Sequence, residues 1–170
     1  MKAEELRALQ APLKDRYRQT PEAACITLRA RGKLDEAGLA CSVETGRALV
    51  EAGLHPLTGG TGLQVCSGDM LLQALVACAG VTLSSVATAL GVHISDGTVS
   101  AEGDIDFRGT LGIDRTAPVG FSEIRLSFDL QTEASPETLA KVVELTERYC
   151  VVFQTLKHSP QLRLAMTRRQ

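Results

Sequence analysis

The fold is decided by one stretch, which runs from Ser67 to Gly91 and reads SGDMLLQALVACAGVTLSSVATALG. It predicts a helix over residues 68–90, about 34 Å long. Ser67 is placed to cap the first turn, Asp69 complements the positive end of the helix dipole, and Gly91 suits the position after the last turn.

Apolar side chains lie nearly all round this helix, a pattern typical of a helix that is enclosed on most sides. The apolar run from Met70 to Val92 is also long enough to cross a membrane. Gln73 and many Thr, Ser and Ala side chains interrupt it, however, and strand-like segments surround it. We therefore predict a buried core helix and no membrane span.

The residues before this helix predict a peripheral helix and a small sheet. Residues 3–19 are polar and predict a short helix outside the core. Apolar and polar residues alternate over 24–31 and again over 39–43, the pattern of a hairpin with its turn at 32–38. A weaker third strand is predicted near 47–50, and the glycines of 58–62 predict a loop.

The residues after the helix predict two more strands, a second helix and a closing strand. The strands are expected over 98–107 and 124–130, where apolar residues alternate with polar ones. Ser135 and Pro136 begin the second helix and Pro160 ends it. The apolar face of this helix consists of Leu139, Val142, Val143, Thr146, Tyr149, Cys150, Phe153 and Leu156. The alternating residues Leu162, Leu164 and Met166 predict the closing strand.

This order of elements predicts the α+β class, because the helices are too few for a repeating βαβ sheet. We expect a single domain over 23–170, with 1–22 as a peripheral extension. Hydrophobic residues make up 44% of the 170 residues and the net charge is −2, which argues against a disordered chain and against a nucleic-acid binder.

The charged start, Met1 to Tyr17, argues against a secretory signal. Five cysteines, an odd number, then favour a reducing compartment, so we predict a cytoplasmic protein. The cysteines and histidines lack zinc-site spacing, and we predict neither a metal nor another cofactor.

Cys78 and Cys150 are the candidate reactive residues. Each lies on an apolar helix surface, where a lone cysteine is most simply a small core residue. Two core cysteines on two helices that pack together could nevertheless lie within disulfide range.

The other cysteines have weaker claims. Cys66 and Cys78 would be about 18 Å apart along one helix, beyond the roughly 7 Å limit for a disulfide. Cys25 and Cys41 could face each other across the hairpin, but the register is open. Cys66 precedes a helix N-terminus, which favours a thiolate and leaves it a minor claim to reactivity.

Two blocks resemble a known family. The block from Cys66 to Cys78, CSGDMLLQALVAC, resembles the central-helix signature of the OsmC/Ohr superfamily. The block from Glu147 to Val152, ERYCVV, resembles the second-cysteine segment of its YhfA-like branch. The order of strands and helices is also similar from about residue 24 to residue 167.

The resemblance implies an intertwined homodimer with the long helices at its centre. It also implies a peroxidase cycle, in which Cys78 attacks the O–O bond of an organic hydroperoxide. The sulfenic acid would condense with Cys150, and an external dithiol would reduce the disulfide.

The resemblance further implies an activating Arg, held by a Glu that lies ten residues before the reactive cysteine. Gly68 stands at that position here, and Asp69 is the nearest carboxylate. Arg31 is the first candidate for the Arg, with Arg29 and Arg47 as alternatives.

The second cysteine also departs from the well-studied peroxidases of the family, because Val151 replaces the Pro that follows it there. The sequence therefore leaves two functions open. One is a thiol-dependent peroxidase; the other is a relative without peroxidase activity that binds a small apolar molecule in the dimer cleft. An inert structural dimer is a third interpretation.

Overall fold

The computed structural model describes residues 2–5, 8, 11, 19, 32–35, 40–44, 49–112 and 114–168. Residues 3–5, 8, 11 and 19 are helical, which agrees with the helix predicted over 3–19. The strand predicted over 24–31 lies outside the described residues, and the domain boundary at residue 22 stays a prediction.

A four-stranded sheet precedes the central helix. Its strands are β1 (Gly32–Asp35), β2 (Ala40–Glu44), β3 (Leu49–Gly53) and β4 (Val65–Cys66), in that spatial order. The first three are antiparallel, and β4 adds in parallel to β3. The turn predicted over 32–38 was therefore wrong, because Gly32–Asp35 pairs with β2. Backbone pairing with a strand that is itself held by β3 outweighs the poor strand propensity of Gly, Lys and Asp.

The central helix α2 spans Ser67–Leu90, close to the predicted range. Its N-cap is Cys66, in an extended conformation, so the prediction of Ser67 as the cap was wrong by one residue. Gly91 ends the helix as predicted, with a φ of 71° and its N–H bonded to Ala87 and Thr88 carbonyls.

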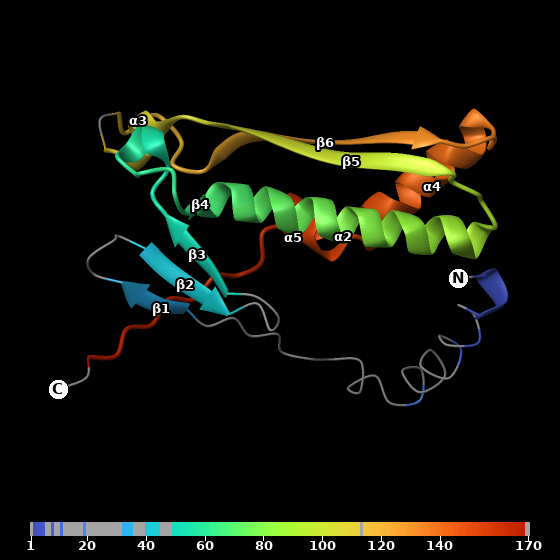
Figure 1. Cartoon of the computed structure of the whole chain (residues 1–170), viewed down its shortest axis with the longest axis horizontal. Helices are drawn as coiled ribbons and strands as arrows, with labels where there is room; N and C mark the ends of the chain where they lie inside the picture. Colours follow the sequence, from blue (N-terminus) through green and yellow to red (C-terminus); the bar gives the residue numbers. More distant parts are fainter. Residues whose placement is uncertain are drawn as a thin grey trace.

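A long hairpin covers one side of α2 (Figure 1). It consists of β5 (Asp96–Ile105) and β6 (Phe121–Gln131), which pair in an antiparallel register that places Val99 opposite Phe128. Phe107 was expected in the first strand but begins the short helix α3 (Phe107–Thr110). Asp106 accounts for this change, because its side chain accepts a hydrogen bond from Arg108 N–H and caps the turn.

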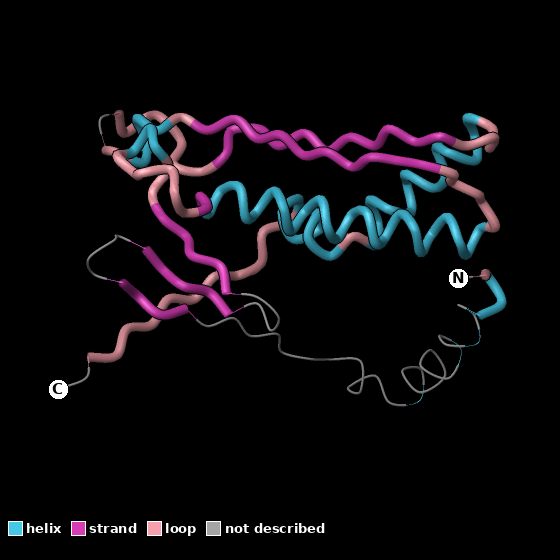
Figure 2. Tube along the Cα trace, viewed as in Figure 1, coloured by secondary structure: helices cyan, strands magenta, loops and turns pink. Residues whose placement is uncertain are grey.

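Two shorter helices also pack against α2 (Figure 2). They are α4 (Pro136–Tyr149), capped by Ser135 as predicted, and α5 (Val151–Lys157). The sequence predicted one continuous helix here, and the structure breaks it at Cys150. That break positions the candidate site.

The core follows every fourth residue of α2. Leu75, Ala79, Leu83 and Ala87 are buried, and they pack against the apolar face of β5 and β6 and against α4 and α5. Of the residues of α2, only this stripe is buried in the single chain, and Val81 is 73% exposed. By length and composition alone α2 could cross a membrane, but its buried stripe packs as the core helix of the domain.

The closing strand predicted at Leu162–Met166 does not form in the single chain. Residues 159–168 have no regular structure, and Leu162, Leu164 and Met166 are 86%, 101% and 92% exposed. A strand needs a neighbour for its N–H and C=O groups, and no described residue of the chain pairs with this segment.

Candidate functional site

Cys78 lies in the middle of α2, one turn after Leu75 and directly before Ala79, both buried. Its own side chain is half-buried and packs at the edge of the core cluster formed by Leu75, Ala79 and Cys150. The helical period thus turns Cys78 partly toward the core and partly toward the surface.

Cys150 is fully buried at the junction of α4 and α5. Its φ of −73° and ψ of 107° are extended, so it ends one helix and precedes the next. The helix breaks although neither Pro nor Gly occurs there. As a result, the N–H groups that follow Cys150 are turned away from the carbonyls of α4.

The two thiols meet across the interface of α2 with α5. Cys78 packs against the core cluster that contains Cys150, and both cysteines are free. Burial raises the pKa of the Cys150 thiol, and the negative charge that develops on Cys78 raises it further. Of the two thiols, Cys78 is therefore the one that ionises more easily.

The pKa of Cys78 lies below its usual range because hydrogen bonds outweigh burial. Burial raises this pKa, but the N–H of Val152, the thiol of Cys150 and the N–H of Val151 lower it, as does the Thr82 hydroxyl. A Pro at residue 151 would have no N–H to offer. Val151 therefore contributes a donor that the Pro implied by the resemblance would lack.

Thr82 is a site residue that the sequence analysis missed. It lies one turn after Cys78 on α2, and its Oγ1 donates to the Cys78 carbonyl at 2.7 Å. The signal was present in the sequence, because residues four apart on a helix are neighbours.

Asp69 lies in the first turn of α2, as expected for an acid at the positive end of a helix, and is exposed. Nine residues separate it from Cys78, about 13 Å along the axis. The structure thus places Asp69 away from the thiol pair, and its catalytic role stays a prediction. Arg29, Arg31 and Arg47 lie outside the described residues.

Gly68, which stands where the resemblance implies a Glu, lies under the ring of Phe121. A Cβ added at Gly68 would be 3.3 Å from Cζ of Phe121 and 3.7 Å from Sγ of Cys66. A larger residue here would have to move the ring, so Phe121 and Gly68 fit each other.

Cys66, the N-cap residue of α2, is free and half-buried. It lies about three helical turns before Cys78. Cys25 lies outside the described residues, as does the side chain of Cys41, whose backbone is in β2. Within the part of the chain that is described, no three His, Cys, Asp or Glu side chains gather to hold a metal ion.

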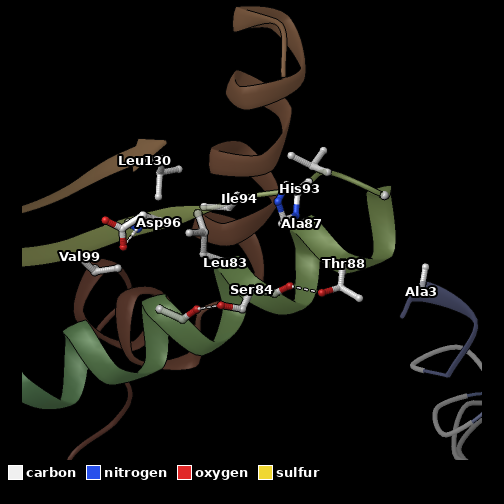
Figure 3. Close-up of a pocket in the computed structure, with 14 residues that line it drawn as sticks. Ala3, Leu83, Ser84, Ala87, Thr88, His93, Ile94, Asp96, Val99 and Leu130 are labelled. Atoms are coloured by element: carbon white, nitrogen blue, oxygen red, sulfur yellow. Dashed lines mark hydrogen bonds between the residues drawn. The ribbon is translucent and has the colours of Figure 1, made fainter. Parts of the chain in front are cut away.

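Two cavities bear on ligand binding. One of about 190 Å³ lies beside Cys150, between β6 and the helices α4 and α5; its lining is mainly apolar and consists of Leu126, Phe128, Val143, Thr146, Glu147, Cys150 and Phe153. The other, about 580 Å³, is an open groove at the C-terminal end of α2 (Figure 3). Neither Cys78 nor Cys150 lines the groove.

The fold and the paired thiols define a small α+β protein with a two-cysteine site, in which Cys150 is buried and Cys78 is half-buried. The family model of the OsmC-like protein matches residues 60–165, and the chain belongs to this family. The assignment to the OsmC/Ohr superfamily and the α+β class are thereby confirmed. No curated protein sequence matches the chain.

Solved structures share the fold at low identity. An OsmC-like protein from Mycoplasma pneumoniae is 18% identical, with a TM-score of 0.66 over 79% of this chain and 89% of that one. An organic hydroperoxide resistance protein from Elizabethkingia anophelis is 17% identical, with a TM-score of 0.62 over 80% and 91%. One from Legionella pneumophila is 15% identical, with a TM-score of 0.62 over 79% and 92%.

Proposed function

We propose that this protein is a thiol-dependent peroxidase that reduces organic hydroperoxides through Cys78 and Cys150. The observation that carries the proposal is the packing of Cys78 against the buried Cys150, with both thiols free. In this arrangement the pKa of Cys78 is lowered and that of Cys150 is raised. A peroxidase needs one thiolate to attack and one nearby thiol to condense. Structural relatives described as organic hydroperoxide resistance proteins support the choice of substrate.

The proposed cycle has three balanced steps. The Cys78 thiolate attacks the outer oxygen of ROOH; with one proton taken up, ROH leaves and Cys78 becomes a sulfenic acid. The Cys150 thiol then displaces water from this sulfenic acid, and the disulfide forms. An external dithiol reduces the disulfide to two thiols and is itself oxidised to a disulfide.

Intact-mass analysis tests the proposal. Reduced protein receives one equivalent of cumene hydroperoxide, and its cysteine peptides are then mapped. The expected result is a loss of two hydrogens that maps to a Cys78–Cys150 bridge, and Cys150→Ser is expected to hold a sulfenic acid on Cys78. An unchanged mass with unreactive Cys78 would contradict the peroxidase.

The homodimer is part of the same proposal. The exposed alternation Leu162, Leu164 and Met166 has the form of a strand without a neighbour, and Val81 leaves an apolar surface open on α2. A second copy would cover both. We further propose a cytoplasmic location, where dithiol reductants keep the pair reduced. Sedimentation equilibrium of the full chain tests the dimer.

The cavity beside Cys150 favours a second candidate function, the binding of a small apolar molecule without peroxide chemistry. Its volume of about 190 Å³ and its Leu, Phe and Val walls suit an apolar group. In that case an apolar ligand stabilises wild type and Cys78→Ser equally against heat. A peroxidase instead loses all turnover in this variant.

A further inference from the structure

The break at Cys150 leaves three N–H groups without helical partners. In an unbroken helix the N–H of Val151 would donate to the Glu147 carbonyl, four residues back. The last bond of α4 runs from Cys150 N–H to the Thr146 carbonyl at 2.9 Å, and the first of α5 from Gln154 N–H to the Cys150 carbonyl at 2.9 Å. The N–H groups of residues 151–153 lie between these two bonds.

The Glu147 carbonyl does not stay without a donor. The side-chain amide of Gln154 donates to it from Nε2 at 2.8 Å, and this bond is partly buried. Gln154 thus occupies the acceptor that the N–H of Val151 would use in a continuous helix. A partly buried carbonyl without a donor would cost free energy, and a continuous helix would avoid this cost by pairing the carbonyl with the N–H of Val151. Because the Gln154 amide already pairs with the carbonyl, the helix gains little from this bond.

We propose that Gln154 is a positioning residue for the reactive thiol. By satisfying the Glu147 carbonyl it holds the break open. The N–H groups of Val151 and Val152 then stay available to the Cys78 thiolate, because Val152 and Cys78 pack on the same core cluster. No residue with special backbone preferences marks the break, which is why a side chain has to hold it.

A second contact joins the same two helices and serves as the matched control. Nζ of Lys157 lies 2.6 Å from Oε1 of Glu147, but both side chains are about half exposed. An exposed ion pair contributes little, and it touches the carboxylate of Glu147, not its carbonyl. Lys157→Met therefore removes a contact between α4 and α5 without freeing the carbonyl.

The inference rests on the proposed role of Cys78 as the reactive thiol, but its test uses no peroxide. The alkylation rate of Cys78 by iodoacetamide is measured against pH in the full reduced protein, by peptide mapping. Gln154→Met is expected to slow alkylation at neutral pH about threefold to tenfold and to move the midpoint of the profile upward. Lys157→Met is expected to keep the wild-type profile.

A spectroscopic readout separates positioning from general damage to the fold. In wild type the amide resonances of Val151 and Val152 are expected to shift with pH at the midpoint of Cys78, and Gln154→Met is expected to abolish this shift. Gln154→Lys, which keeps an N–H donor, should restore it at high salt, where the added charge is screened. A wild-type profile in folded Gln154→Met, or equal losses in the Gln154 and Lys157 variants, overturns the inference. A failed peroxide assay alone does not, because alkylation needs no peroxide.

Discussion

The hydroxyl of Thr82 offers the sharpest test of how this protein makes a thiolate. Its single proton is donated to the Cys78 carbonyl at 2.7 Å, while the same hydroxyl helps to lower the pKa of Cys78. The carbonyl also accepts the helical N–H of Thr82, so the hydroxyl can turn to the sulfur when the thiolate forms. Thr82→Val removes the proton and keeps the shape of the side chain.

The magnitude follows from the energy of one hydrogen bond. A net contribution of about 1 kcal/mol corresponds to roughly fivefold less thiolate at any pH well below the midpoint. Since only the thiolate reacts, alkylation of Cys78 at neutral pH is expected to slow by the same factor. At high pH, where the thiol is fully ionised in both proteins, the two rates should converge.

The assay is the initial rate of iodoacetamide alkylation across pH, read on the Cys78 peptide. Thr88→Val is the matched control, because Thr88 Oγ1 donates to the Ser84 carbonyl at the same distance of 2.7 Å. Thr88 lies six residues further along α2, about 9 Å from Thr82 along the axis, so its variant should alkylate as wild type does. Equal rates for Thr82→Val and wild type, or equal losses in both variants, would refute the assigned role of the hydroxyl.

Two further predictions concern stability. Because the pKa of Cys78 is lowered in the folded state, its contribution to stability is fully present above the pKa of the unfolded thiol and is lost as pH falls through the folded pKa. Urea unfolding of reduced wild type should therefore gain stability with rising pH in this range relative to Cys78→Ser, and identical pH slopes would contradict the lowered pKa. Leu75→Ala removes a side chain that is only 1% exposed and should cost about 3 kcal/mol in urea unfolding. Leu63→Ala, at a residue that is 88% exposed, should stay within about 0.5 kcal/mol of wild type, and similar losses in the two variants would argue against the core described above.

Much of the fold could be predicted because its signals are local. Asp69 and Gly91 marked the ends of α2, and the apolar period of residues 136–156 turned Cys150 toward the core. The alternation of apolar and polar residues predicted the ends of β5 and β6 to within three residues of the observed ends. Two cysteines on helices that must pack together were enough to single out the pair.

Other features depended on contacts between distant residues, and local patterns could not show them. The predicted turn at 32–38 contains a strand because β2 is there to pair with it. The predicted strand at Leu162–Met166 is absent because no described neighbour pairs with it. Gly68 can be understood only beside Phe121, which lies 53 residues further along the chain (121 − 68 = 53).

The sequence by itself determined that Cys150 lies on the apolar face of its helix and that Cys78 lies on an apolar helix, because helical periodicity is a property of a single segment. Only the tertiary structure showed why the two thiols differ: hydrogen bonds to the sulfur lower the pKa of Cys78, and burial raises that of Cys150. That difference depends on the break at Cys150, which no Pro or Gly marks. At the break the Gln154 amide on α5 donates to the Glu147 carbonyl, which a continuous helix would have paired with the N–H of Val151.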